Sequence, residues 1–166
     1  MRNQALFLNG MYEDVLEQIL SIQAELPEQI MFIQPYSDNR IVKLAQEPPS
    51  VDDPMPCYFS VTTDLNNVHF TAEIVGWDDK RKLSTARRNA ISRLIWTLQH
   101  DECGLYDSVG DVEKPCVNLL HIRRLKRVSQ PFSVKRLMLT SENRPMQGER
   151  TTSGHWAYVD AQPLDE

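Results

Sequence analysis

The sequence lacks the features that mark several large classes of protein. None of its apolar runs approaches the roughly 20 residues that a helix needs to cross a bilayer. Its N-terminus carries acidic residues inside the first apolar stretch, which is wrong for a signal peptide. Three cysteines, Cys57, Cys103 and Cys116, are an odd and widely spaced set that does not suit a disulfide framework. We therefore expect a soluble cytoplasmic protein without a membrane partner.

Catalytic motifs are absent as well. The chain has no Gly-rich phosphate loop, no Gly-x-Ser-x-Gly and no His-Glu-x-x-His. Its two adjacent carboxylate pairs, Asp52/Asp53 and Asp78/Asp79, diverge as chain neighbours do, and they suit turns or helix starts. The sequence therefore predicts no catalytic residue and no cofactor, and a binding protein more readily than an enzyme.

The charge that is present is unevenly distributed. Residues 1–79 hold three basic and thirteen acidic side chains, whereas residues 80–166 hold fifteen basic and ten acidic ones. An asymmetry of this kind indicates a surface that faces a polyanion. The predicted partner is therefore DNA or RNA, with the choice between them open.

The pattern of apolar residues predicts one α+β domain over 1–160, followed by an acidic tail over 161–166. We expect a curled, mostly antiparallel sheet or a small β-barrel with flanking helices. Helices are predicted at 12–24 and at 83–99, the second capped by Ser84. Strands are predicted at 5–8 (closed by a turn at Asn9-Gly10), 30–33, 40–44, 57–62, 68–75, 116–128 and 155–159, with a strand or short turn at 132–139 and a loop at 47–56.

The strand after the predicted hairpin turn alternates between two faces. Period-two alternation places Trp77 on the opposite face from the most apolar residues of this strand. The apolar face is expected to hold Val68, Phe70, Ala72, Ile74 and Gly76, and the other face His69, Thr71, Glu73, Val75 and Trp77.

Basic residues form two groups, one around the second helix and one after the strand near residue 120. If the fold brings the groups together, they make a groove that neutralises phosphates. The alternative is two unrelated solvated faces, neutralised by the acidic first half. The candidates for phosphate contact are Lys80, Arg81, Arg88, Arg123, Arg124 and Arg127.

Four aromatic residues are candidates to hold a base. Trp156 and Tyr158 are two apart on a predicted strand, so they share a face and could form one wall of a pocket. Trp77 ends a strand, and Tyr36 lies in a polar turn. The alternative for each of them is core packing with one polar end in water.

Zinc-ligand residue types recur at His100, Cys103, Cys116 and His121, at distances similar to those of zinc fingers. The order of the ligands is unusual, however, and an offset of five puts Cys116 and His121 on opposite faces of a strand. Buried apolar cysteines are the alternative, and we predict no metal site.

Three stretches of the chain resemble the PUA-like superfamily, in particular its EVE and ASCH branches. They are residues 5–10 leading into a helix, the hairpin over 57–77, and the late strand from 117 with the proline-led turn at 131–137. The resemblance implies a small β-barrel that binds RNA or DNA, with a modified base accepted in an aromatic pocket. It also implies that Tyr36, Trp77 and Trp156 line that pocket while arginines hold the backbone.

These observations lead to three hypotheses of different classes. The first is a nucleic-acid-binding module without catalytic activity, which reads a modified base. The second is a regulatory module that docks a protein through the acidic helix face Glu13/Asp14/Glu17 or through the basic helix at 83–99. The third is an ASCH-type nuclease or amidohydrolase, for which Lys43, Glu73 and His69 are the polar groups to test. The oligomeric state is left open.

Overall fold

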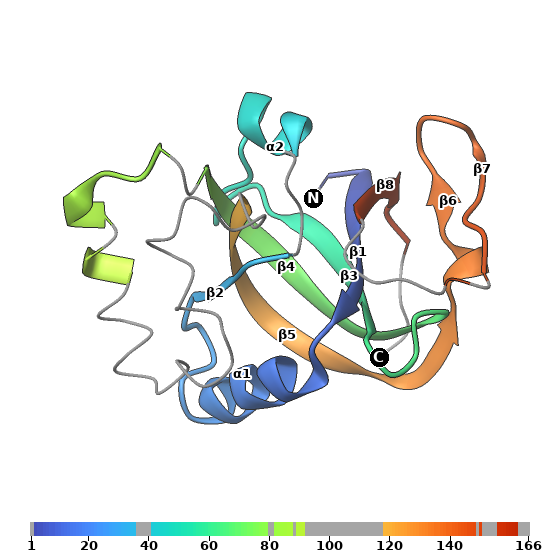
Figure 1. Ribbon diagram of the computed structural model, residues 1–166, viewed down its shortest axis with the longest axis horizontal. Coiled ribbons are helices and arrows are strands. Elements are labelled where there is room, and N and C mark those ends of the chain that lie inside the picture. Colours follow the sequence, from blue (N-terminus) through green and yellow to red (C-terminus); the bar gives the residue numbers. More distant parts are fainter. Residues whose placement is uncertain are drawn as a thin grey trace.

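The described part of the chain folds around one eight-stranded sheet (Figure 1). The computed structural model describes residues 2–35, 41–79, 82–87, 89–91, 118–148, 150 and 156–162. The strands are β1 (Gln4–Met11), β2 (Met31–Ile33), β3 (Met55–Val61), β4 (Asn67–Asp79), β5 (Asn118–Ser133), β6 (Met138–Leu139), β7 (Arg144–Pro145) and β8 (Trp156–Asp160). The labelled helices are α1 (Glu13–Glu25), α2 (Val42–Gln46) and the 3-10 turn η3 (Val134–Arg136). Residues 85–87 and 89–91, inside the predicted helix at 83–99, are helical as well.

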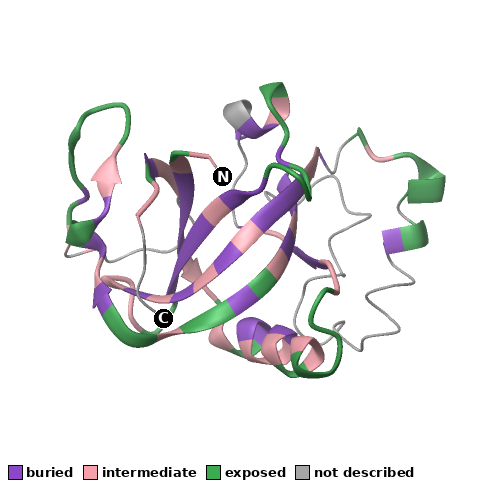
Figure 2. Ribbon diagram, turned by 180° about the vertical axis from the view of Figure 1, so that it is seen from behind, coloured by how far each residue is buried: buried purple, intermediate pink, exposed green. Residues whose placement is uncertain are grey.

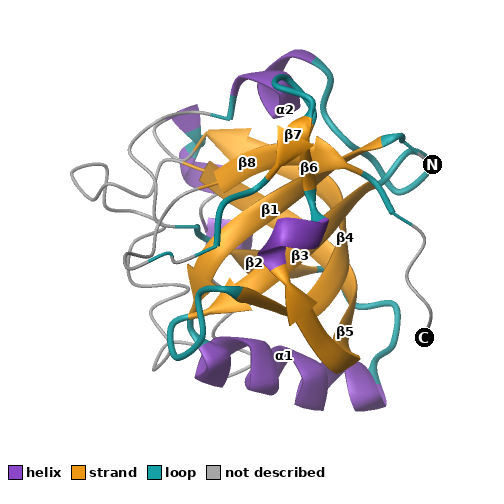
Figure 3. Ribbon diagram, turned by 90° about the vertical axis from the view of Figure 1, so that its right-hand side faces the viewer, coloured by secondary structure: helices purple, strands orange, loops and turns teal. Residues whose placement is uncertain are grey.

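The sheet is mixed, mostly antiparallel and open. Its order is β2-β5-β4-β3-β1-β8-β6-β7, so β2 and β7 are its two edges. Among the described strands, β1 and β3 are the only parallel neighbours. The expected α+β domain with a curled antiparallel sheet is confirmed (Figure 3). The alternative of a closed barrel is wrong, because no pairing joins the two edge strands.

The central strand β1 is buried on both faces, which explains its continuous apolar run. Leu6 and Leu8 face the main core cluster, to which α1, α2 and the long strands also contribute. Ala5 and Phe7 point to the other side, into a second cluster beneath η3 and the β6–β7 hairpin. Figure 2 shows the resulting alternation of buried and partly exposed residues along the long strands.

Helix α1 confirms the predicted helix at 12–24 to within one residue. Val15, Leu16 and Ile19 are its buried residues, at helical spacing. Glu13 and Asp14 lie in the first turn, where the helix dipole favours negative charge. The hairpin of β3 and β4 and the last strand β8 are likewise confirmed. No helix within the described residues has the length and apolar character to cross a membrane.

Two local predictions are wrong. Asn9-Gly10 does not end β1, because Gly10 has a φ of 75° and forms an irregularity inside the strand. Ser60 holds this irregularity: its hydroxyl accepts from the Gly10 N–H and donates to the Asn9 side chain. The strand predicted at 40–44 is instead the short helix α2, since Ile41 and Leu44 are three residues apart and both fully buried.

The face predicted for Trp77 is also wrong. The pairing of β4 with β5 shifts between Ile74 and Gly76, which is a β-bulge. A bulge inserts one extra residue and reverses the alternation beyond it. Trp77 therefore packs against the same core cluster as Ile74.

Near the C-terminus, Ala161 and Gln162 are tied to the domain. The Ala161 N–H donates to Asn3 O, and the Gln162 N–H donates to the Tyr58 hydroxyl. The remainder of the predicted tail lies outside the described residues.

Candidate nucleic-acid interface

Trp156 and Tyr158 form an aromatic pair on β8. Their ring centroids are 5.4 Å apart and the planes meet at 73°, an edge-to-face arrangement. Opposite them on β1 lie Leu8 and Leu6, so both rings are on the side of the main core cluster. Both residues remain partly exposed. The pair is therefore packed on its core side, and both residues retain some exposed surface.

Trp77 has a different environment. Its indole N–H donates to Asn118 Oδ1 at 2.9 Å, and the same oxygen accepts from the Ile41 N–H. Trp77 lies on β4, three places from β8 in the sheet order. Tyr158 pairs with Leu6 of β1, Leu6 pairs with Cys57 of β3, and Cys57 pairs with Ala72 of β4. The row of paired residues that contains Tyr158 therefore crosses β4 at Ala72, five residues before Trp77. Trp77 is thus held by the fold in a row of its own, apart from the aromatic pair.

Several predicted contact residues cannot be placed. Tyr36, Lys80, Arg81 and Arg88 lie outside the described residues, as do the side chain of Lys43 and the residues His100, Cys103 and Cys116 of the hypothetical zinc site. Whether the two basic groups converge therefore stays a prediction.

The arginines of β5 are paired with acids from the first half of the chain. Arg123 Nε donates to Glu73 Oε1 at 2.9 Å, and the two side chains are only 11% and 17% exposed. Arg127 pairs with Glu17 of α1 at a much more open position, with 50% and 46% exposure. Arg123 is therefore part of the fold, whereas an exposed pair such as Arg127–Glu17 is typically worth under ~1 kcal/mol and exchanges readily for another anion.

Arg124 also contacts Glu73, although chain neighbours on a strand normally point to opposite faces. Its φ of 54° is in the left-handed region, at the place where two β5 residues oppose one β4 residue. This bulge turns Arg124 Nη1 to within 3.5 Å of Glu73 Oε2, and Nη2 to within 3.4 Å of Glu28. Two consecutive arginines thus share one carboxylate.

A histidine and an aspartate that the sequence analysis did not pair lie across the β4–β5 bulge. His121 Nε2 is 2.7 Å from Asp78 Oδ2, and Arg87 reaches the same oxygen at 3.4 Å. Burial opposes ionisation of Asp78, but the bond to His121 and the charges of His121 and Arg87 outweigh it and hold the pKa of Asp78 below its ordinary value. The other His121 nitrogen lies against Gly76, where a Cβ atom would be 2.3 Å from Nδ1. Both ring nitrogens are therefore enclosed by protein.

Two of the three groups suggested for hydrolysis, Glu73 and His69, are occupied by partners of their own. Glu73 is bound by Arg123 and Arg124, and His69 Nε2 lies 2.9 Å from Asp64 Oδ2. Cys57 is buried, and burial raises the pKa of its thiol well above the usual value. Within the described part of the chain, no three His, Cys, Asp or Glu side chains gather as a metal site would require.

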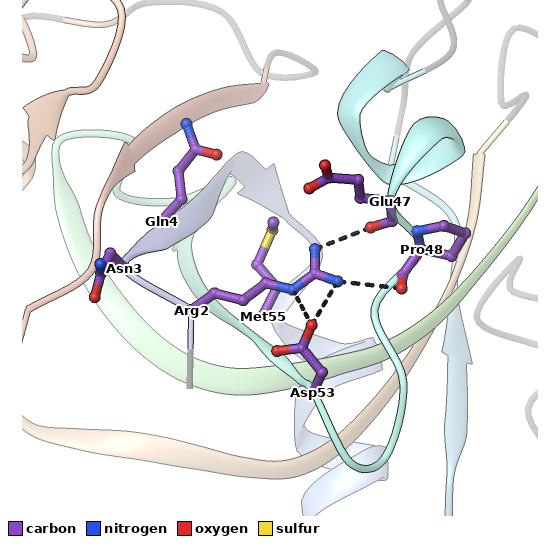
Figure 4. A pocket seen from close by; sticks show the side chains of 7 residues that line it. All are labelled: Arg2, Asn3, Gln4, Glu47, Pro48, Asp53 and Met55. Atoms are coloured by element: carbon purple, nitrogen blue, oxygen red, sulfur yellow. Dashed lines mark hydrogen bonds and ion pairs between the residues drawn. The ribbon is translucent and has the colours of Figure 1, made fainter.

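A cavity of about 530 Å³ opens beside the start of β1 (Figure 4). The Arg2 guanidinium crosses it and donates to Asp53 and to the carbonyl oxygens of Glu47 and Pro48. Met55 and Gln4 complete the part of the wall next to β1. None of the described residues that line the cavity is aromatic, and Nε, Nη1 and Nη2 of Arg2 each already bind a protein oxygen, so the cavity does not fit a stacked base.

Comparison of the chain with protein-family models, with curated proteins and with solved structures finds no match. The likeness to the PUA-like superfamily therefore rests on the three stretches of sequence already named.

Proposed function

We propose that this protein is a nucleic-acid-binding module that stacks an unpaired base on Trp156 and Tyr158. The observation that carries the proposal is the edge-to-face pair itself, with both rings partly exposed on one face of β8. Stacking of a base on an aromatic side chain contributes about 1–3 kcal/mol and tolerates any base, because every base has a π-face. A pocket wall of this kind also accommodates a modified base.

The proposal includes kinship with the PUA-like superfamily, in which EVE-like members accept a modified base in an aromatic pocket. An open curled sheet with α1 directly after its strand β1 is compatible with an elaborated member of that group, although the sheet is not a closed barrel. We favour Trp156 and Tyr158 over Trp77 as the stacking residues, because they form a ring pair on one face of β8, whereas Trp77 lies in a separate row of the sheet.

Substitution of Trp156 tests the proposal. Binding of labelled single-stranded DNA and RNA should weaken by roughly tenfold or more in Trp156→Ala, with no change in its dependence on salt. Tyr12→Ala is the matched control, because Tyr12 is an aromatic residue 67% exposed at the start of α1 and away from β8. Equal affinities of Trp156→Ala and Tyr12→Ala would contradict the proposal. Oligonucleotides that differ by one modified base then test base selectivity.

A second candidate is a docking surface for a basic protein at the start of α1. There Tyr12 is exposed beside Glu13 and Asp14, and neither carboxylate has an ion pair among the described residues. This candidate predicts that Tyr12→Ala, and not Trp156→Ala, abolishes capture of a protein partner.

A further inference from the structure

Three cations beside η3 differ from the arginines of β5. Among the described residues, Lys135, Arg136 and Arg150 have no acidic group within ion-pair distance, whereas Arg123 and Arg127 each bind a glutamate. Lys135 and Arg136 are exposed, and Arg150 is partly buried. This is positive charge that the acidic first half of the chain does not neutralise.

Two of these cations lie on aromatic rings of the same core cluster. Arg136 Cζ is 4.7 Å from the centroid of Phe132, and Arg150 Cζ is 5.3 Å from the centroid of Phe7. A guanidinium held against a ring face has a fixed orientation, and its N–H donors at the outer edge stay available for a further partner. Both rings belong to the cluster beneath η3, so the two cations lie on the same side of the sheet.

Asn66, in the turn between β3 and β4, fixes the position of Arg150 relative to η3. Its backbone carbonyl accepts from the Val134 N–H at the start of η3. Its side chain accepts from the Arg150 N–H at 2.6 Å and donates to Arg150 O at 3.4 Å. Lys135 in turn lies along Gly148, where a Cβ atom would be 2.7 Å from Lys135 Cε. The backbones of η3 and of Arg150 are thus both tied to Asn66, and the Lys135 side chain lies along Gly148, two residues before Arg150.

Arg150 carries a polar atom that the protein leaves unsatisfied. Its Nε is buried and has no hydrogen-bond partner within the described part of the chain. Burial also lowers the pKa of the Arg150 guanidinium from its ordinary value, because it disfavours the charged form. Since a buried donor without a partner costs about 1–3 kcal/mol, such an atom calls for an explanation. Since Nε itself is buried, an anion would bind the other N–H groups of the guanidinium and stabilise its charge.

We propose that Lys135, Arg136 and Arg150 form a binding site for a phosphate group. Arginine edges match the oxygens of phosphate in a bidentate way, and a lysine adds a mobile point charge. The inference deepens the proposed function and rests on it for the source of the phosphate, which is then the backbone of the bound strand. A free phosphate or pyrophosphate ion offers the same chemistry.

The test measures binding of labelled single-stranded DNA between about 50 and 200 mM salt. The Lys135→Gln/Arg136→Gln variant alters only exposed side chains, and Arg150→Gln is examined alongside it. Arg144→Gln is the matched control, because Arg144 is an exposed arginine that is already paired with Glu142. Pyrophosphate binding to the same proteins is followed by calorimetry. Thermal unfolding checks that each variant is folded. If Arg150→Gln does not fold, the test depends on the Lys135→Gln/Arg136→Gln variant.

The expected result is a loss of roughly tenfold in affinity for the double variant. The slope of log affinity against log salt concentration should become shallower by about one unit, or slightly less, for each lost phosphate contact. The affinity and slope of Arg144→Gln should equal those of the wild-type protein. Oligonucleotide binding with equal slopes in all variants overturns the phosphate site and leaves the proposed function standing. Pyrophosphate binding that the variants lose, in a protein that binds no oligonucleotide, supports the site and overturns the proposed function. Binding of neither ligand overturns both.

Discussion

Gln23 and Leu125 are joined by two hydrogen bonds, one in each direction. The Gln23 side-chain amide donates to Leu125 O at 2.9 Å, and its carbonyl oxygen accepts from the Leu125 N–H at 2.9 Å. Leu125 lies in the bulge of β5, where one residue of the strand has no direct partner on β4. The amide of Gln23 therefore takes the place of the missing strand neighbour and links α1 to the sheet.

Replacement of Gln23 should destabilise the protein through this link. In Gln23→Ala the Leu125 N–H and carbonyl lose their partners, and we expect the free energy of unfolding to fall by about 2–3 kcal/mol. Glu25→Ala is the control, because Glu25 is an exposed residue of the same helix. Urea denaturation measures both variants. A loss in Gln23→Ala no larger than that in Glu25→Ala would show that water satisfies the bulge.

Arg124 permits a separate measurement of the cost of the bulge. Its φ of 54° costs a residue with a Cβ atom about 1 kcal/mol or more, a cost that glycine does not have. Arg124→Gly and Arg124→Ala both lose the contacts with Glu73 and Glu28. We therefore expect Arg124→Gly to be about 1 kcal/mol more stable than Arg124→Ala in denaturant titrations, the reverse of the order found in a regular strand. Greater stability of Arg124→Ala would mean that the residue adopts an ordinary extended conformation.

Gly76 is required because β5 approaches it closely. An alanine Cβ would lie 2.3 Å from His121 Nδ1, and His121 cannot retreat, since it packs against Phe32 and binds Asp78. Gly76→Ala should cost about 1–3 kcal/mol of stability, as overpacking does. Gly148→Ala is the matched control: the nearest atom there is the end of the flexible Lys135 side chain, so its cost should stay within about 0.5 kcal/mol. Equal losses in the two variants would contradict this account.

The parts of the fold that depend on local pattern could be predicted from the sequence. Helix α1 follows from apolar spacing, and the β3–β4 hairpin follows from two β-branched runs around a polar turn. The short helix α2 could not be predicted in this way, because five residues carry too little periodicity to separate a helix from a strand. Bulges cannot be predicted for a different reason: the position of the extra residue depends on the partner strand, and this is why the predicted face of Trp77 is wrong.

The candidate site likewise contains some features that follow from local sequence pattern and others that depend on the partner strand. Two residues apart on one strand, Trp156 and Tyr158 could be expected to form a pair. Arg123 and Glu73 are 50 residues apart, so their union is decided by the strand register and not by any local signal. Arg150 is a single basic residue in a polar stretch, and nothing in the sequence marks it. Gly76 did carry a signal, because a glycine within a strand often marks a close approach of another group.

The bond between Asp64 and His69 makes stability depend on pH. The hydrogen bond to His69 lowers the pKa of Asp64 from its ordinary value, bonds from Asn67 and Asn66 add to this, and burial opposes it. Since the carboxylate is favoured in the folded state, its contribution to stability is complete above the unfolded pKa of about 3.9 and is lost as the pH falls through the lower folded pKa.

Asp64→Asn should therefore lose less stability than the wild-type protein between about pH 5 and pH 3, as measured by urea unfolding at both values. Glu25→Gln serves as the control, because Glu25 is an exposed carboxylate without an ion pair among the described residues. Glu25→Gln should lose as much stability between these two pH values as the wild-type protein does. An equal loss in Asp64→Asn and wild type would mean that Asp64 gains nothing from His69 in the folded protein, and that the turn before β4 is held by Asn66 and its contacts with Arg150 and Val134 instead.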